Sequence, residues 1–217
     1  DSHSPLPHRL GREANVFELE KISYREVIDA VRCKDPARLK FTIETDPAYG
    51  KYHWTGHRGC NVSLPPQEAR KLGNICPVCR RKLTKGVEQR VEELADRPAD
   101  FKPAYTPGFI RLLPLSEIIA TVLGGNSPST QAVWKIYNAL ISHFGDEYKV
   151  LLDASEEALM EVADAAIARA VLQVRAGAVK VIPGYDGVYG KLILEEAALA
   201  EKARHGRVQQ LNLADFW

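Results

Sequence analysis

Four residues that can bind a metal ion are arranged as two short pairs in the first half of the chain. His57 and Cys60 are separated by two residues, and Cys76 and Cys79 repeat this spacing after fifteen further residues. Two such pairs can close one tetrahedral zinc site, in which one imidazole and three thiolates fill every position. A site without an open position stabilises a fold and does not activate water. We therefore expect a zinc ribbon with a structural zinc ion.

The fourth ligand is the least certain member of this set. His53 lies one turn upstream of His57, and Cys33 is the remaining thiol. Cys33 ends a helical pattern, where a lone cysteine more often packs as a small hydrophobic residue, so we favour His57. The alternative is a redox pair at Cys76 and Cys79. No strand-to-helix thioredoxin pattern surrounds that pair, and the basic residues after it suit a zinc knuckle.

Basic residues gather around the metal-binding pairs. Nine lysines and arginines lie between residues 51 and 90, and Arg58, Arg80, Arg81 and Lys82 are the nearest to the proposed ligands. Such a cluster suits the phosphates of a nucleic acid. A surface that is merely solvated is the alternative.

A second group of candidate nucleic-acid contacts lies near the end of the chain. Residues 179–194 alternate around a glycine-rich turn and predict a β-hairpin. Its side chains Tyr185, Tyr189 and Lys191 can stack on bases and hold phosphates. Alternatively, the tyrosines pack against a neighbouring helix.

The elements that position these residues follow from capping, periodicity and turn residues. We expect strands over 39–45 and 49–55, and helices over 24–32, 65–73, 87–95, 115–123, 130–144 and 156–175. Three prolines within 97–108 predict a connection between domains. The predicted fold class is α+β. The predicted segments are an N-terminal segment over 1–50, a finger over 51–96, the connection over 97–108, a helical domain over 109–209 that carries the hairpin, and a tail over 210–217.

The tail forms a motif of its own. Gln210 is followed by Leu213 and by the aromatic pair Phe216 and Trp217. One helical turn presents the three apolar side chains as a plug for a groove, with Gln210 as a polar anchor. This pattern resembles sliding-clamp peptides of both the archaeal and the bacterial kind, so we expect a sliding clamp as a partner. The alternative is docking on the chain's own helical domain.

Composition limits the class of protein. The chain has 217 residues, 45% of them hydrophobic, and a formal net charge of +1. No apolar run approaches the roughly twenty residues of a membrane-spanning helix, so we expect no membrane partner. Cysteines in metal-binding spacing favour a reducing compartment, which predicts a cytoplasmic protein. The only methionine is Met160, which leads us to expect a fragment or a processed product.

Several motifs together resemble the C-terminal half of the endonuclease Q family. They are residues 1–5 and 8–13, the finger, and the runs 92–98 and 183–190. Because that family is similar to the PHP phosphoesterases, the resemblance implies the C-terminal end of a PHP barrel, a zinc finger and a helical domain. It also implies a DNA repair parent that nicks DNA on the 5′ side of deaminated bases, such as uracil and hypoxanthine, or of abasic sites.

The resemblance implies a metal-binding role for two of the first residues. Asp1 and His3 can share a metal on an extended strand, but alone such a pair is more often incidental. Both match the last metal motif of the PHP site, which implies zinc, manganese or magnesium there. The earlier PHP motifs are absent from this chain, so we expect no complete catalytic site and no activity of the chain by itself.

DNA is the partner that the resemblance implies, in the interior of a prokaryotic cell and in association with the nucleoid. Arg9 and Arg12 then join the basic and aromatic candidates as DNA contacts. Two other functions remain open, namely a non-catalytic zinc-ribbon adaptor between DNA and a sliding clamp, and an accessory domain of a helicase-like protein. The second has no phosphate-binding Gly-x-x-x-x-Gly-Lys-Ser/Thr run to support it.

Overall fold

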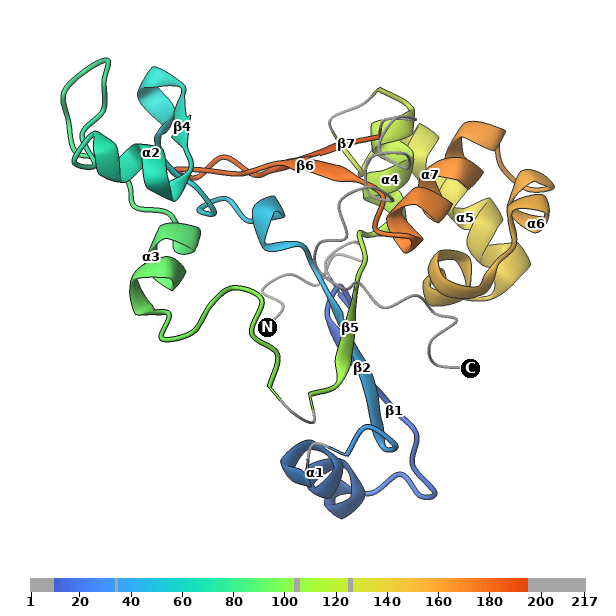
Figure 1. Cartoon of the computed structure of the whole chain (residues 1–217). Helices are drawn as coiled ribbons and strands as arrows, with labels where there is room; N and C mark the ends of the chain where they lie inside the picture. Colours follow the sequence, from blue (N-terminus) through green and yellow to red (C-terminus); the bar gives the residue numbers. More distant parts are fainter. Residues whose placement is uncertain (1–9, 34, 104–105, 125–126, 195–217) are drawn as a thin grey trace. The chain divides into compact units, whose positions relative to one another are not determined.

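The computed structural model describes residues 10–33, 35–103, 106–124 and 127–194, which form two compact units (Figure 1). The first, here called the sheet–helix unit, combines described residues of 1–45 and 102–179 with Leu194. The second, the finger unit, combines 46–101 with 180–193. The sequence grouped the hairpin with the helical domain, whereas the contacts group it with the finger. The α+β class is confirmed.

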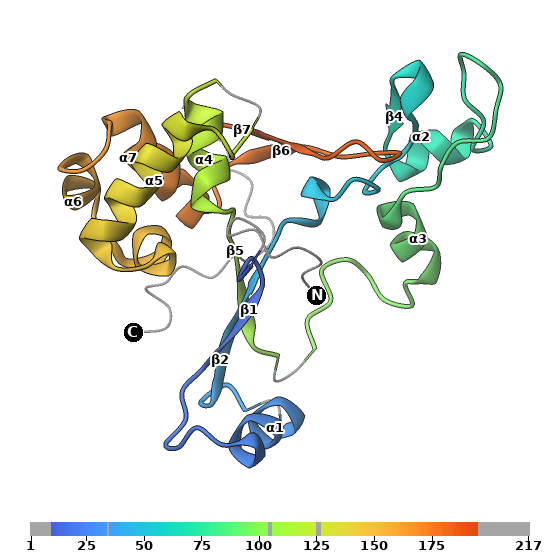
Figure 2. The ribbon, with the colours of Figure 1, turned by 180° about the vertical axis from the view of Figure 1, so that it is seen from behind.

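The sheet–helix unit contains a three-stranded sheet with the order β1-β2-β5, visible in Figures 1 and 2. Strand β1 is antiparallel to β2, and β5 is parallel to β2. The predicted strand β2 alternates buried and less buried residues, as a strand with one covered face does. Sequence analysis missed β5 because it directly follows the proline-rich connection. The strands are β1 Ala14–Phe17, β2 Leu39–Glu44 and β5 Gly108–Arg111.

Helices complete this unit. Helix α1 begins where the sequence predicts, because the Ser23 hydroxyl accepts a hydrogen bond from the Glu26 N–H at 3.3 Å. Helix α4 packs against α5 and α7, and the core between them includes Ile118, Leu140 and Ile167. The helical elements are α1 Tyr24–Cys33, α4 Leu115–Val122, α5 Gln131–Phe144, the π-helix η3 Lys149–Asp153, α6 Glu156–Met160 and α7 Ala165–Arg175.

The single helix predicted over 156–175 is wrong, because the structure has two helices with a break between them. The N–H groups of Val162 and Ala163 both donate to the carbonyl of Leu159, which closes α6. Asp164 then adopts an extended conformation and serves as the N-cap residue of α7. The bend allows Leu159 and Ile167 to be buried from two differently directed helices.

The finger unit is built from short elements. The strand predicted over 49–55 is also wrong: Asp46 caps a 3₁₀ turn by accepting from the Ala48 N–H at 2.9 Å, and a strand begins only at Thr55. The predicted helices α2 and α3 and the antiparallel hairpin β6–β7 are present. The elements are η1 Pro47–Tyr49, β3 Thr55–His57, η2 Arg58–Cys60, β4 Val62–Leu64, α2 Pro66–Lys71, α3 Val87–Leu94, β6 Lys180–Ile182 and β7 Lys191–Ile193.

Within the part of the chain that the structure describes, no helix has both the length and the apolar character needed to cross a membrane.

Candidate metal centre and nucleic-acid interface

The two predicted ligand pairs meet in the finger unit. One ligand atom from each of His57, Cys60, Cys76 and Cys79 can be chosen so that all four lie within 4.8 Å of one another. Zinc–sulfur bonds of about 2.3 Å in a tetrahedron place neighbouring sulfurs about 3.8 Å apart, so a small contraction would close the site around an ion. Nδ1 of His57 already lies 3.3 Å from Sγ of Cys79. The donor set and the spacing therefore fit zinc.

Each ligand pair sits on a tight turn that is followed by a residue with left-handed backbone. Asn61 follows the first pair and Arg80 the second, and both have a positive φ, of 52° and 63°. The Asn61 N–H donates to the Arg58 carbonyl, and the Arg80 N–H donates to the Cys76 carbonyl. A left-handed residue after the second ligand reverses the chain, which is how both ligands of a pair come to face one point.

The free thiols are not equivalent. The side-chain hydrogen bond with Cys79 and partial desolvation raise the pKa of Cys60 to about 11. For Cys76, the backbone N–H of Cys79 outweighs desolvation and lowers the pKa to about 6. Metal binding requires deprotonated thiols, and backbone N–H groups directed at a sulfur favour that form.

The two alternative candidates for the fourth ligand, His53 and Cys33, do not belong to the four-residue cluster. Nε2 of His53 lies 3.3 Å from Oε2 of Glu88, a residue of α3, and His53 is not a member of the four-residue group. Cys33 is exposed at the end of α1 and is not a member either. The choice of His57 is the one that the geometry supports.

The hairpin turn is anchored on the first ligand pair. Oδ2 of Asp186 accepts a hydrogen bond from the Arg58 N–H at 2.6 Å, and its Oδ1 accepts from the Thr84 hydroxyl at 2.6 Å. The Tyr185 hydroxyl donates to Oδ1 of Asn61 at 2.7 Å. Sequence analysis did not find Asp186 or Thr84, because these contacts join residues more than 100 positions apart.

Basic side chains in the finger unit differ in their surroundings. Arg70 lies 2.6 Å from Glu92, and Lys85 lies 2.8 Å from Glu93. Arg80, Arg81 and Lys82, by contrast, are exposed, and no carboxylate within the described ranges forms an ion pair with them. The exposed cations therefore concentrate at the second ligand pair. Arg58 and Lys191 are exposed as well.

The two hairpin tyrosines have different roles. Tyr185 pairs with Trp54 in a β-bridge, and its ring packs so close to Gly56 that a Cβ there would lie 2.5 Å away. Tyr185 therefore packs within the finger unit. It packs against β3, the strand that ends at the candidate ligand His57, and not against a helix. Tyr189 is 51% exposed. Lys51 lies close to the rings of both Tyr189 and Tyr52. Sequence analysis had not considered Tyr52 as a candidate.

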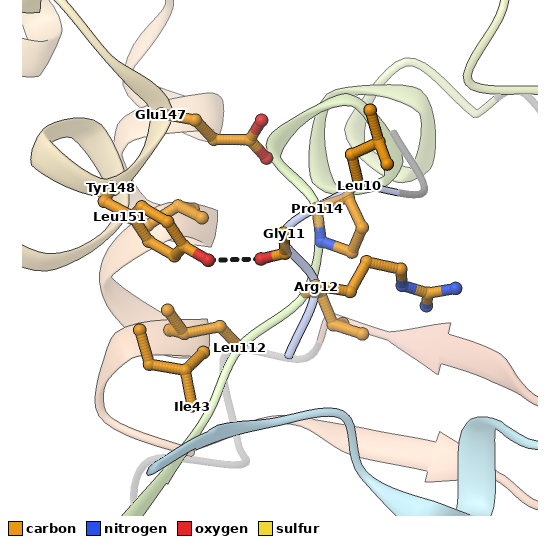
Figure 3. A pocket seen from close by; sticks show the side chains of 10 residues that line it. Leu10, Gly11, Arg12, Ile43, Leu112, Pro114, Glu147, Tyr148 and Leu151 are labelled. Atoms are coloured by element: carbon orange, nitrogen blue, oxygen red, sulfur yellow. Dashed lines mark hydrogen bonds between the residues drawn. The ribbon is translucent and has the colours of Figure 1, made fainter. Parts of the chain in front are cut away.

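The sheet–helix unit holds a cavity of about 200 Å³ beside the predicted DNA contact Arg12. Figure 3 shows the Tyr148 hydroxyl donating to the carbonyl of Gly11, while the Arg12 guanidinium points away from Tyr148. Glu147 accepts from the Leu115 N–H at 2.7 Å and from the Tyr137 hydroxyl at 2.8 Å. The other lining residues are Leu10, Ile43, Leu112, Leu113, Pro114 and Leu151.

The polar residues that line this cavity hold the unit together and do not form a reactive group. Burial and the neighbouring Glu147 charge raise the pKa of Tyr148, so its hydroxyl stays protonated and serves as a donor. Arg12 itself is only 17% exposed in its side chain, and its Nη2 lies 3.8 Å from Oε1 of Glu117. The structure thus places Arg12 inside the unit.

Several predicted site residues lie outside the described residues. They are the metal candidates Asp1 and His3, the DNA candidate Arg9, and the tail residues Gln210, Leu213, Phe216 and Trp217.

The finger unit thus combines a four-residue cluster that could hold a zinc ion with exposed cations beside it. Comparisons with known proteins place the chain among these relatives. A family model described as the MJ0043 C-terminal domain matches residues 114–178. Protein MJ0043 of Methanocaldococcus jannaschii is 32% identical over 197 residues, which cover 88% of this chain and 24% of that protein. Protein YqxK of Bacillus subtilis is 28% identical over 193 residues, 88% of this chain and 45% of that protein.

Two solved structures are similar over nearly the whole chain. The lesion-specific endonuclease PfuEndoQ of Pyrococcus furiosus has a TM-score of 0.80 and 35% identity, covering 96% of this chain and 52% of that one. Endonuclease Q in complex with a 27-mer duplex substrate with an abasic lesion at the active site has a TM-score of 0.77 and 35% identity, covering 97% and 51%. The resemblance to the C-terminal half of endonuclease Q is therefore confirmed, and the chain spans about half the length of these proteins.

Proposed function

We propose that this chain is the C-terminal part of a DNA repair endonuclease that nicks DNA on the 5′ side of deaminated bases or abasic sites. The observation that carries the proposal is the match to a lesion-specific endonuclease over 96% of the chain at 35% identity. In this proposal residues 1–50 are the end of a PHP domain, and Asp1 and His3 are ligands of its zinc, manganese or magnesium ions. Metal ions in such a site polarise a phosphate and activate water. The chain alone lacks the remaining ligands and is inactive.

The finger unit supplies the DNA-binding surface in this proposal. His57, Cys60, Cys76 and Cys79 hold a structural zinc ion, which cross-links the two ligand pairs. The cross-link holds the first ligand pair, which contacts the hairpin turn, next to the second pair, which Arg80, Arg81 and Lys82 follow. Arg58 and Lys191 add further charge, and phosphate contacts of this kind position a protein on DNA without reading its sequence. Support comes from the similar endonuclease Q that was solved with duplex DNA.

We further propose that the tail over 210–217 binds a sliding clamp, through the plug formed by Leu213, Phe216 and Trp217 with Gln210 as the polar anchor. The support is its sequence pattern alone. A clamp would keep the endonuclease on the chromosome.

The deciding experiment is a nicking assay with two preparations, this chain alone and the longer protein that contains it. The substrates are duplexes with one uracil, one hypoxanthine or one abasic site, and the undamaged duplex is the control. We expect one zinc ion per chain by elemental analysis, nicking 5′ to the lesion by the longer protein only, and loss of nicking in its Asp1→Asn and His3→Ala variants. A longer protein that binds DNA without nicking any lesion would instead indicate the zinc-ribbon adaptor.

A further inference from the structure

Two exposed tyrosine rings and one lysine form a cluster on the finger unit. Tyr52 is 45% exposed and Tyr189 is 51% exposed. Nζ of Lys51 lies 5.6 Å from the centroid of the Tyr52 ring and 5.8 Å from that of Tyr189. Both distances are within the range of a cation–π contact, so one ammonium group connects a residue before β3 with a residue of the hairpin.

Backbone hydrogen bonds make this cluster rigid. The Lys51 carbonyl accepts from the Gly187 N–H at 2.8 Å, and the Tyr52 carbonyl accepts from the Val87 N–H at 2.8 Å. The hairpin backbone also packs directly on the preceding segment, since a Cβ at Gly190 would lie 2.3 Å from the Ala48 carbonyl oxygen. The rings therefore stand on fixed backbone, and little backbone freedom is lost when they bind a ligand.

The edge of the cluster is positively charged. A Cβ at Gly187 would lie 3.7 Å from Nη1 of Arg58 and 3.8 Å from the Tyr52 hydroxyl, so the guanidinium and Tyr52 both border this turn. The carboxylate of Asp186 is turned toward the Arg58 N–H and the Thr84 hydroxyl. Aromatic faces interleaved with cations on a rigid support are what proteins use to hold unpaired nucleic acid.

We propose that Tyr52 and Tyr189 are a stacking site for unpaired bases, with Lys51 and Arg58 holding the adjoining phosphates. The ligand is a single-stranded or locally opened stretch of DNA, because bases in an intact duplex already stack on their neighbours and offer no free face. The proposal rests on the proposed function as a DNA-binding part of a repair enzyme. It assigns to this surface the strand that is opened at a lesion.

The test measures the affinity of the full 217-residue chain, loaded with zinc, by fluorescence anisotropy at fixed salt. Three DNAs of one sequence are compared: a duplex, the same duplex with a central unpaired loop, and the single strand. Tyr52→Ala and Tyr189→Ala are expected to weaken binding of the single strand and the looped duplex roughly 5- to 150-fold each, as loss of one stacked base does. Binding of the intact duplex is expected to change less than threefold.

Two sets of variants separate stacking from other effects. Tyr52→Phe and Tyr189→Phe keep the ring and are expected to bind like the wild type, so an equal loss in the Phe variants would overturn the stacking role. Tyr24→Ala removes a tyrosine that is 82% exposed on α1 and is expected to change nothing. Normal binding by both Ala variants, with weaker binding by Arg80→Ala, would reject this inference and leave the proposed function intact. A zinc-loaded chain that binds none of the three DNAs would reject both.

A second measurement requires no variant. A single strand carrying 5-iodouracil is irradiated with the wild-type chain, and the adducts are mapped by mass spectrometry. Adducts at Tyr52 or Tyr189 are expected. Adducts that form only elsewhere would contradict the proposed surface.

Discussion

At the scale of single residues, the ligand assignment makes the sharpest prediction. Cys79→Ser leaves three strong ligands and, because metal affinity depends on each thiolate, is expected to reduce bound zinc from one ion per chain to well below half of that after dialysis. His57→Ala is expected to do the same. Elemental analysis of the purified variants is the measurement.

The chain provides matched controls for these ligand variants. Cys33→Ser removes an exposed thiol outside the cluster, and His53→Ala removes an imidazole that faces Glu88. Both are expected to keep a full zinc ion. Loss of zinc in His53→Ala with retention in His57→Ala would reverse the assignment of the fourth ligand.

Thr55 connects β3 with α3 through two hydrogen bonds. Its buried hydroxyl donates to Oε1 of Gln89 at 2.7 Å and accepts from the Gly86 N–H at 2.9 Å. Thr55→Val keeps the shape and removes both bonds, which leaves two buried polar groups without a partner. The expected loss of unfolding free energy is about 1–3 kcal/mol. Urea unfolding is the measurement, and Thr42→Val, which removes an exposed hydrogen bond to Glu44, is expected to cost far less.

At the scale of elements, the anchor between hairpin and finger can be tested through Asp186. Asp186→Ala removes both acceptors and places alanine at a positive φ of 41°. Faster hydrogen exchange is therefore expected for amides of the hairpin, such as Gly187 and Gly190. Asp186→Asn keeps one acceptor oxygen and tolerates the left-handed conformation, so its effect is expected to be smaller. Asp96→Ala, at an exposed side chain, is the control.

The same anchor marks the limit of what the sequence predicts. Spacing alone located the four candidate ligands, because each pair is a local motif. Alternation located β2, and alternation around a glycine-rich turn located the hairpin. The contact of Asp186 with Arg58 spans 128 positions and leaves no local pattern. The parallel pairing of β5 with β2 is non-local in the same way. Long-range packing therefore decided both of these outcomes. The break before Asp164 is instead local, because the N–H groups of Val162 and Ala163 close α6 on the Leu159 carbonyl.

At the scale of the whole molecule, the two units are expected to respond differently to metal removal. The finger core is small and consists of Val62, Cys76 and Leu83 with Cys60 and Leu64 beside it, so two of its members are candidate ligands. A core of that size does not hold a fold by itself. A chelator is therefore expected to speed hydrogen exchange throughout 46–101 and 180–193, while α4, α5 and α7 keep their protection. Loss of protection in both units together would show that the metal supports more than the finger.

The last prediction separates local charge from the net charge of the chain. A net charge of +1 by itself gives no reason to expect DNA binding. In the proposed function, affinity depends on the exposed cations at the second ligand pair, each of which releases about one counterion from DNA. Changing Arg80, Arg81 and Lys82 together to alanine is expected to reduce the slope of log affinity against log salt by about 3. The control variant changes Arg25, Lys40 and Lys149, which lie within ion-pair distance of Asp29, Glu18 and Asp146, and alters the net charge equally. An equal reduction in both variants would mean that total charge, and not the finger surface, attracts the DNA.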